Sequence, residues 1–392
     1  MVNKYIVDDT KIYNEEALMR ASTLSVSSKR QSTIAKSLDR RFMDEGVFNT
    51  IVSSNNIINE VYLDFTPSQI IDCIDHPEQY QTYLNKNSMY LDRGALNVFF
   101  INLRLSSPQK LLAEHIIFLN DILTKGPNDI YVMPSIQFGK GDRYTKMDVY
   151  SDFVGKMISC KNTRAPGSLN LGITVPSFYG HKDMNDLFKL YSSENAEPTF
   201  VSVDFKGSSI EDRKRMKVVD ALNAHYAAEG TEDFFLYGLN LRSYKSGPSN
   251  PVSEEMLIAR SGLNAVGAPH RAPGGRGGSK ITQIEKLGAI FDPADYCFHY
   301  LSEQDQKERL CDWAFDRGYY FDIDNNMTKD APKIMSAVKK FNLVMENNEF
   351  FTVSYAIRKN DKDLLKGILD KGNNLSVAAV VTDPAQRTLD SF

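Results

Sequence analysis

The sequence has few of the features that mark secreted proteins, membrane proteins or proteins that coat nucleic acid. Its 392 residues include four cysteines, too few for a disulfide framework. It has no apolar run near the roughly 18 residues of a membrane span and no apolar signal segment at the N-terminus. A net charge of −4 excludes non-specific coating of nucleic acid, so any such contact must be local. We expect a protein of the reducing cytoplasm that makes no membrane contact.

Metal-binding patterns are also scarce. The chain contains no Cys-x-x-Cys pair. Cys297, His299 and Cys311 are the one soft-ligand set that zinc could accept, and core packing is the favoured interpretation of these residues. We therefore expect no metal and no cofactor.

What the sequence does contain is a series of short apolar runs rich in β-branched and aromatic residues. Most are nearly continuous, which is typical of parallel strands buried on both faces. Segments with helical periodicity separate most of them, such as 107–126 and 208–230, which both end in glycine. The eight runs cover residues 60–65, 96–105, 129–138, 169–178, 198–205, 233–241, 255–267 and 288–300.

Eight such runs with intervening helices predict an α/β fold, a (β/α)8 TIM-like barrel over residues 57–318. An open doubly wound sheet is the alternative. Residues 1–56 predict a partly helical N-terminal segment, because Ile34, Leu38 and Phe42 follow helical spacing beside basic residues. For residues 319–392 we predict a helical C-terminal extension that ends in a polar tail.

Polar side chains recur where the predicted strands end, which is where barrel enzymes place their active sites. We take Asp64 and Asp204 as candidate acid/base groups because carboxylates at such ends can exchange protons with a substrate. Individual members of the set have caps and turns as their alternative roles. The candidate substrate-binding residues are Asn102, Gln137, Gly238, Asn240, Asn264 and His270.

The segment 262–280, GLNAVGAPHRAPGGRGGSK, contains six glycines and a cluster of basic residues. Barrels often bind phosphate with the loops after strands seven and eight, through glycine amides and a helix N-terminus. The segment matches no strict phosphate-loop signature, so a surface loop with chance basic residues is the alternative. The candidate phosphate-binding residues are Arg271, Gly274, Gly275, Arg276, Gly277, Gly278 and Lys280.

Three short motifs carry a resemblance to a known family. NAVGAP (264–269), KLGAIFDP (286–293) and YGLNL (237–241) resemble motifs of the tRNA-guanine transglycosylase superfamily, which includes enzymes that insert deazaguanines into DNA. The resemblance implies a (β/α)8 barrel that exchanges a guanine-type base, with Asp292 as the nucleophile and tRNA or DNA as the partner. The family's third-strand Asp-Ser-Gly-Gly-Phe motif and its four-ligand zinc site are absent.

Three functions are therefore open. The first is a nucleic-acid-modifying transglycosylase, and the second is a metabolic barrel enzyme that acts on a small phosphorylated substrate. The third is a barrel that binds nucleic acid without turnover. The acidic net charge favours the second, whereas local clusters of lysine and arginine favour the first. The sequence does not specify an oligomeric state.

Overall fold

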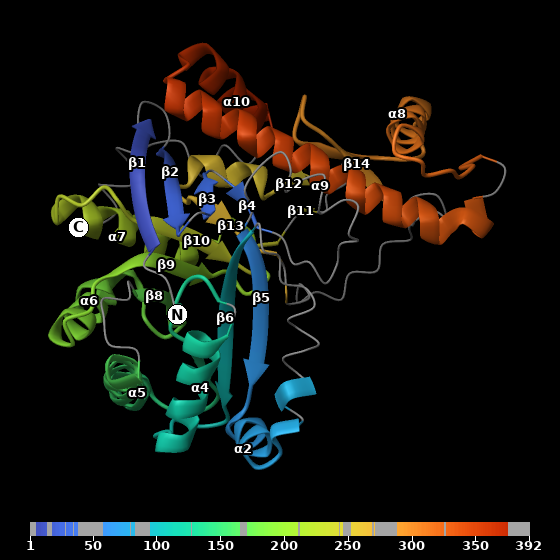
Figure 1. Ribbon diagram of the computed structural model, residues 1–392. Helices are drawn as coiled ribbons and strands as arrows, with labels where there is room; N and C mark the ends of the chain where they lie inside the picture. The colour runs from blue at the N-terminus through green and yellow to red at the C-terminus, as the bar shows by residue number, and fades with distance from the viewer. Residues whose placement is uncertain are drawn as a thin grey trace.

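The protein is a mixed α/β structure built on parallel strands (Figure 1). The computed structural model describes residues 5–13, 18–27, 29–33, 35–37, 58–78, 80–82, 95–126, 128–164, 171–210, 212–242, 244–245, 252–268, 270, 288–324 and 327–374.

Two parallel sheets form its centre. The larger has five strands in the order β4 (Ala35–Lys36), β13 (Ala265–Val266), β10 (Phe235–Leu239), β9 (Pro198–Asp204) and β8 (Leu171–Val175). The smaller contains β5 (Ile58–Phe65), β6 (Leu96–Leu105) and β7 (Ser135–Phe138). Single parallel bridges, Val98 with Ile130 and Val132 with Gly172, connect β6 to β8. Because every pairing is parallel, the carboxyl ends of these strands point the same way.

Helices follow most of these strands, as the sequence predicts. They are α2 (Pro67–Asp75), α4 (Ala113–Lys125), α5 (Arg143–Arg164), the 3₁₀ turn η2 (His181–Asp183), α6 (Met184–Ser193) and α7 (Arg213–Ala228). The start of α2 shows why a helix forms there. Thr66 accepts a hydrogen bond from the backbone N–H of Gln69, whose side chain accepts one from the N–H of Thr66, and Pro67 follows in the first turn.

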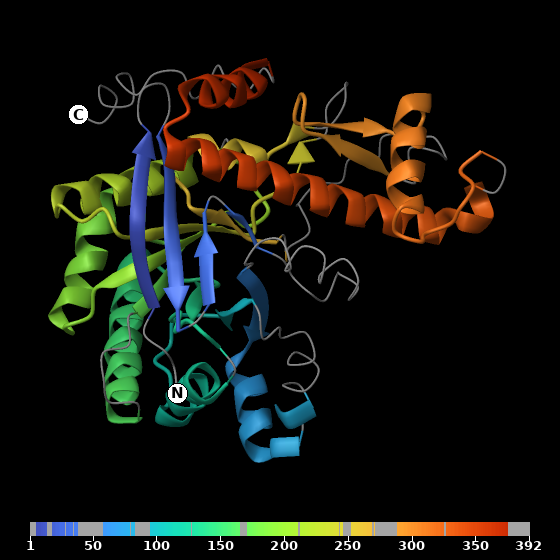
Figure 2. The same cartoon turned by 45° about the horizontal axis from the view of Figure 1, so that its top comes forward.

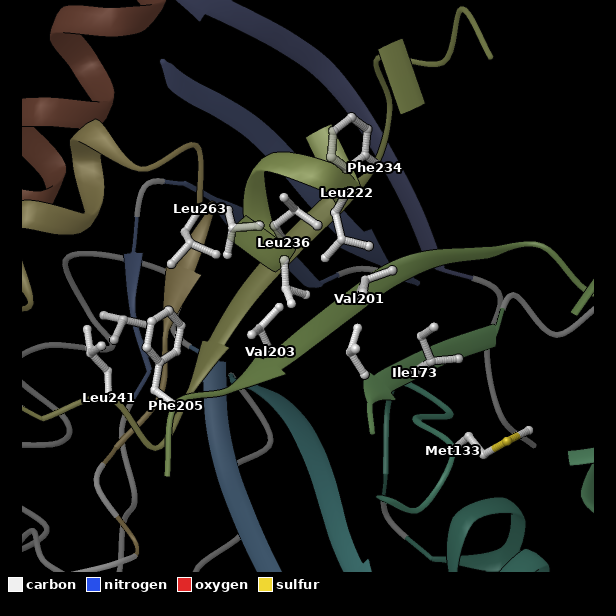
Figure 3. Packing of buried hydrophobic residues seen from close by; sticks show 14 of the residues in the cluster. Met133, Ile173, Val201, Val203, Phe205, Leu222, Phe234, Leu236, Leu241 and Leu263 are labelled. Carbon is white, nitrogen blue, oxygen red and sulfur yellow. The ribbon is translucent and has the colours of Figure 1, made fainter. Parts of the chain in front are cut away.

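The strands have apolar side chains on both faces, which explains the continuous hydrophobic runs. One face packs against the helices, and Val201, Val203 and Leu236 belong to the same hydrophobic core as Leu222 of α7 (Figure 3). The opposite face carries a separate core of Phe200, Phe235, Tyr237, Phe100 and other strand residues.

The N-terminal segment is not helical where the structure describes it. It forms an antiparallel sheet of β1 (Tyr5–Tyr13), β2 (Met19–Val26) and β3 (Lys29–Ser32), followed by β4. Tyr5 and Leu24 join the inner core of the parallel strands, whereas Met19 joins the helix-covered core. The described residues form strands in this part of the predicted segment, and in β2 nearly every side chain is buried, which suits a strand that is covered on both faces. Ile34, Leu38 and Phe42 themselves lie outside the described residues.

The prediction that residues 288–300 form the last barrel strand is wrong. Residues 288–300 form an antiparallel hairpin of β14 (Ala289–Asp292) and β15 (Cys297–Tyr300), which pairs with β12 (Val252–Ser253) and β11 (Tyr244–Lys245). The short 3₁₀ helix η3 (Met256–Arg260) follows β12. The strand that pairs with β13 is β4, from the N-terminal segment. Among the described residues, no ladder joins β4 to β5, so a closed barrel is not seen.

The described part of the C-terminal region is helical. It contains α8 (Gln304–Phe315), α9 (Met327–Lys359) and α10 (Lys362–Asn374). Figures 1 and 2 both place α8 and β14 beside the N-terminal part of α9, away from β8 and β9. Trp313 and Phe341 belong to a third hydrophobic core in this region. Within the described ranges, no helix has the length and apolarity needed to cross a bilayer.

Candidate functional site

Two aspartate–asparagine pairs lie at the carboxyl ends of the parallel strands. Asp64 of β5 accepts a hydrogen bond of 2.5 Å from the Asn102 side chain on β6, and Arg104 Nε lies 3.8 Å from the same carboxylate. Asp204 of β9 accepts a hydrogen bond of 2.9 Å from the side chain of Asn240, which follows β10. In both cases a side-chain amide from the neighbouring strand or the turn after it donates to the carboxylate. The sequence predicted all four residues as site candidates.

The turn after β10 aims Asn240 at its partner. Asn240 has a φ of 54°, in the left-handed region that asparagine tolerates better than most residues. Its side chain donates to Asp204, and its Oδ1 accepts a 3.1 Å hydrogen bond from the backbone N–H of His270. The loop after β13 is thereby joined to the ends of β9 and β10.

Glu60 is a buried carboxylate on which polar groups from three other parts of the chain converge. It lies in β5, and only 1% of its surface is exposed. Ser37 Oγ donates to its Oε2 at 3.0 Å, the Tyr237 hydroxyl donates to the same oxygen, and His270 Nε2 contacts Oε1. A buried carboxylate without partners costs free energy on folding. The hydrogen bonds to Glu60 avoid this cost and therefore hold the members of the cluster in one arrangement.

His270 is held on several sides. Its ring stacks on Tyr62 with 4.6 Å between the ring centroids and 13° between the planes. Its side chain is 3% exposed, and that of Glu60 is fully buried. The imidazole is therefore oriented by a carboxylate and a ring face while its backbone contacts Asn240. A carboxylate that orients a histidine is a recurring device for acid/base chemistry.

Gly267 provides the space for this cluster. A Cβ atom at this position would lie 2.4 Å from Glu60 Oε2 and 3.0 Å from the Tyr237 hydroxyl. Both atoms are engaged in the hydrogen bonds described above. The chain must therefore lack a side chain where it passes the cluster.

Four other sequence candidates have different surroundings. Gln137 lies on β7 in register with Arg104, near the Asp64 pair. The Cα of Gly238 faces Leu263 and Phe205 in the helix-covered core, while its carbonyl accepts a 2.7 Å hydrogen bond from Gly267 N. Asn264 is fully buried, accepts a hydrogen bond from Leu236 N at 2.8 Å and donates to Ser22 Oγ at 3.1 Å, which is a structural role.

Asp292 is the fourth of these candidates and lies outside the parallel sheets. In the β14–β15 hairpin it stands opposite Cys297. Its Oδ2 accepts a 2.8 Å hydrogen bond from Arg309 of α8. This ion pair accounts for the carboxylate without a substrate.

The predicted phosphate-binding residues Arg271, Gly274, Gly275, Arg276, Gly277, Gly278 and Lys280 lie outside the described residues. Within the described ranges, no group of three or more His, Cys, Asp or Glu side chains is arranged to hold a metal ion. His299, one of the soft-ligand candidates, instead contacts Asp295 Oδ2 at 2.8 Å through Nε2.

The sequence interpretation missed Glu60, Tyr62, Tyr237 and Ser37 as site residues. Glu60 had a recognisable signal, because a charged residue that opens a nearly continuous hydrophobic strand must find partners inside the protein. Tyr62 and Tyr237 had no such signal, since an aromatic residue in a buried run is normally part of the core. Ser37 could not be found because β4 was not recognised as a strand.

A separate cavity of about 970 Å³ lies between α6 and α7. Phe188 and His225 stack along it with ring centroids 3.8 Å apart, and Pro198 and Thr199 of β9 also line it. Burial lowers the pKa of His225, while the nearby Glu229 opposes that shift. None of the candidates predicted from the sequence lines this cavity.

No family model matches the sequence, and no curated protein matches it. Among solved structures, one similar chain is a β-mannanase from Thermomonospora fusca, with 15% identity and a TM-score of 0.31 over 73% of this chain and 89% of that one.

The resemblance to the tRNA-guanine transglycosylase superfamily is therefore withdrawn. No family model and no curated protein supports that resemblance. The physical reason lies in the motif that suggested the family. Phe291 and Asp292 belong to an antiparallel hairpin and not to a parallel strand, so Asp292 cannot be the nucleophile at the end of an eighth barrel strand.

Proposed function

We propose that the protein is an enzyme that acts on a small phosphorylated substrate at the carboxyl ends of its parallel strands. His270 is the acid/base group, and Glu60 is the positioning residue that orients it. The observation that carries the proposal is the convergence of Ser37, Tyr237 and His270 on the buried Glu60 carboxylate. When the imidazole gains a proton from the substrate, Glu60 balances the new charge.

The Asp204–Asn240 pair is the adjoining part of the proposed site. Asn240 bonds to the backbone of His270, so a substrate held by Asp204 lies near the histidine. A carboxylate at this position suits the hydroxyl groups of a polar substrate, since each hydroxyl donates one hydrogen bond. In the sequence, Arg271 directly follows His270, and Arg276 and Lys280 follow within the same glycine-rich segment. These basic residues support a phosphorylated substrate over a neutral one.

We also infer that the parallel strands close into a (β/α)8 barrel with β4 as its first strand. The pairing of β13 with β4 and the bridge from Val132 to Gly172 support this order. The Ser37–Glu60 hydrogen bond spans the remaining step between β4 and β5. In this arrangement the acid/base cluster lies inside the barrel, at the junction of its first and last strands.

The proposal is tested by ligand-induced thermal stabilisation of the full chain. The ligands are ribose 5-phosphate, glycerol 3-phosphate, inorganic phosphate, tRNA and single-stranded DNA, at about 50 and 200 mM salt. We expect a phosphate ester to raise Tm, and an excess of about 100 Kd adds about 2.7 kcal/mol to stability. Asp204→Asn should abolish the effect, whereas Asp292→Asn, the matched control on the hairpin, should retain it.

Acid/base chemistry is then followed by proton NMR of the stabilising ester in D2O. We expect the protein to exchange or convert a substrate proton, and His270→Gln to lose this activity while it still binds the ester. His225→Gln is the control, because that histidine lies in the α6–α7 cavity. Stabilisation by polynucleotide alone, weakening steeply with salt, would instead favour a nucleic-acid-binding protein. The enzyme proposal fails if no ester binds, or if Asp204→Asn binds as well as the native protein.

A further inference from the structure

A second buried polar cluster lies on the other side of β4. The Lys36 ammonium contacts Glu255 Oε2 and lies 2.7 Å from Glu346 Oε2 of α9. The exposed fractions of the three side chains are 12%, 0% and 3%, respectively. Ser253 Oγ donates to the other oxygen of Glu346 at 3.1 Å. Three segments, β4, residues 252–258 and α9, therefore meet at one ammonium group.

The charges in this cluster do not balance. One lysine faces two carboxylates, which leaves a net negative charge in a buried place unless a proton is added. Among the described residues, both oxygens of Glu255 are buried without a hydrogen-bond partner, and Oε2 has the ion-pair contact with Lys36 alone. A buried carboxylate oxygen in that position is costly unless a donor reaches it. A protonated carboxyl group in the cluster removes the excess charge.

The position of the cluster links it to the candidate site. β4 is short, and its backbone is held by hydrogen bonds from Ala35 N to Asn264 O and from Ser37 N to Val266 O, at 3.1 and 2.8 Å. Ser37, the next residue after Lys36, donates to Glu60. Lys36 therefore anchors β4 on one side, and the next residue, Ser37, contacts Glu60 on the other side.

We infer that Lys36, Glu255 and Glu346 form a proton-controlled latch that holds α9 against β4 and so positions Ser37 at the Glu60–His270 cluster. With a proton on Glu346, the cluster is neutral and closed. When that proton is lost, the two carboxylates repel each other across one ammonium, and the contact between α9 and β4 loosens. The latch requires no catalysis, so it stands independently of the proposed function.

The direction in which pH changes the stability follows from the altered pKa of Glu346. Burial raises the pKa of Glu346 above its ordinary value of 4.5, with Lys36 opposing the rise and Glu255 adding to it. A raised carboxyl pKa means that the folded state binds the proton more tightly than the unfolded state. The stabilisation is complete below the ordinary value and is lost as the pH rises through the raised one.

No other titratable group described next to Glu346 compensates for this change. Lys36 faces it from β4 and Glu255 faces it from the 252–258 segment. Glu349, one turn further along α9, has its own partners, since it accepts from Lys371 Nζ at 3.1 Å and from the Tyr296 hydroxyl at 2.8 Å. Glu349 therefore provides a matched control on the same helix.

The test compares Tm against pH for the native chain, Glu346→Gln and Glu349→Gln, from about pH 5 to 8. Glutamine mimics the protonated carboxyl. Glu346→Gln should match the native Tm at low pH and exceed it increasingly as the pH rises, whereas the Glu349→Gln difference should not grow in this way. Glu255→Gln is the second variant, because it leaves one carboxylate for one lysine and should also remove the excess pH dependence.

Hydrogen exchange then reports on β4 directly. In the native chain, the protection of residues 35–37, corrected for the intrinsic effect of pH on exchange, should fall as the pH rises. In Glu346→Gln it should stay constant. A Tm difference between Glu346→Gln and the native chain that does not change with pH, or equal protection of β4 in both proteins at every pH, overturns the latch.

Discussion

Replacing Gly267 with alanine tests the geometry of the Glu60 cluster with a single methyl group. The new Cβ would lie 2.4 Å from Glu60 Oε2, well inside van der Waals contact, and 3.0 Å from two atoms of Tyr237. The carboxylate cannot move away freely, because Ser37, Tyr237 and His270 all contact it. The substitution must therefore break at least one of these hydrogen bonds or displace the backbone.

The expected cost combines two effects. Overpacking of a tight interior typically costs about 1 to 3 kcal/mol, and loss of a hydrogen bond to a charged group costs about 1.5 to 3 kcal/mol. We expect Gly267→Ala to lower the free energy of unfolding by about 3 kcal/mol, measured by urea denaturation. Gly238→Ala is the control, since the nearest atom to its new Cβ is a terminal methyl of Leu263 at 3.2 Å, and it should cost less than about 1.5 kcal/mol. A loss below about 0.5 kcal/mol for Gly267→Ala would show that the cluster is not held as described.

Two further substitutions test the inner core and the C-terminal helices. Phe200 is fully buried and stacks on Phe235 with ring centroids 5.1 Å apart, so Phe200→Ala should lower the free energy of unfolding by about 3 to 5 kcal/mol; a value under about 1 kcal/mol would contradict the inner core. Gly367 lies inside α10, and a Cβ added there would meet no neighbouring atom within 4 Å, so Gly367→Ala should raise the free energy of unfolding by about 0.5 to 1 kcal/mol. A destabilised Gly367→Ala protein would mean that a neighbour occupies that space.

The sequence predicts the central strands well because burial on both faces produces nearly continuous hydrophobic runs. The run 96–105 coincides with β6, and the runs 60–65, 198–205 and 233–241 overlap β5, β9 and β10. Parallel strands at the centre of a fold need apolar side chains at nearly every position, so local composition reports their tertiary environment.

The ends of the chain were harder to predict because their pairing is decided at long range. β4 has two residues, and its pairing with β13, more than 200 residues away in the sequence, makes it a strand. The run 288–300 contains a signal for a turn. Asp292 and Pro293 interrupt it with turn-forming residues, and a turn there predicts a hairpin in place of one strand.

The candidate site was predicted in part. Parallel strands bring their carboxyl ends to one edge, so Asp64, Asn102, Asp204 and Asn240 could be identified from position alone. Glu60 could not be identified as a site residue in this way, because its role depends on Ser37 and Tyr237, which approach from strands distant in the sequence. Side-chain convergence of this kind requires the three-dimensional arrangement.

The most direct test of the central claim is a crystal structure of the full chain with a bound phosphate ester. We predict that the ester lies beside the Asp204–Asn240 pair and within hydrogen-bonding distance of the His270 imidazole. An ester bound only in the cavity between α6 and α7, or only near Asp292 on the hairpin, would contradict the assignment of the functional site to the carboxyl ends of the parallel strands.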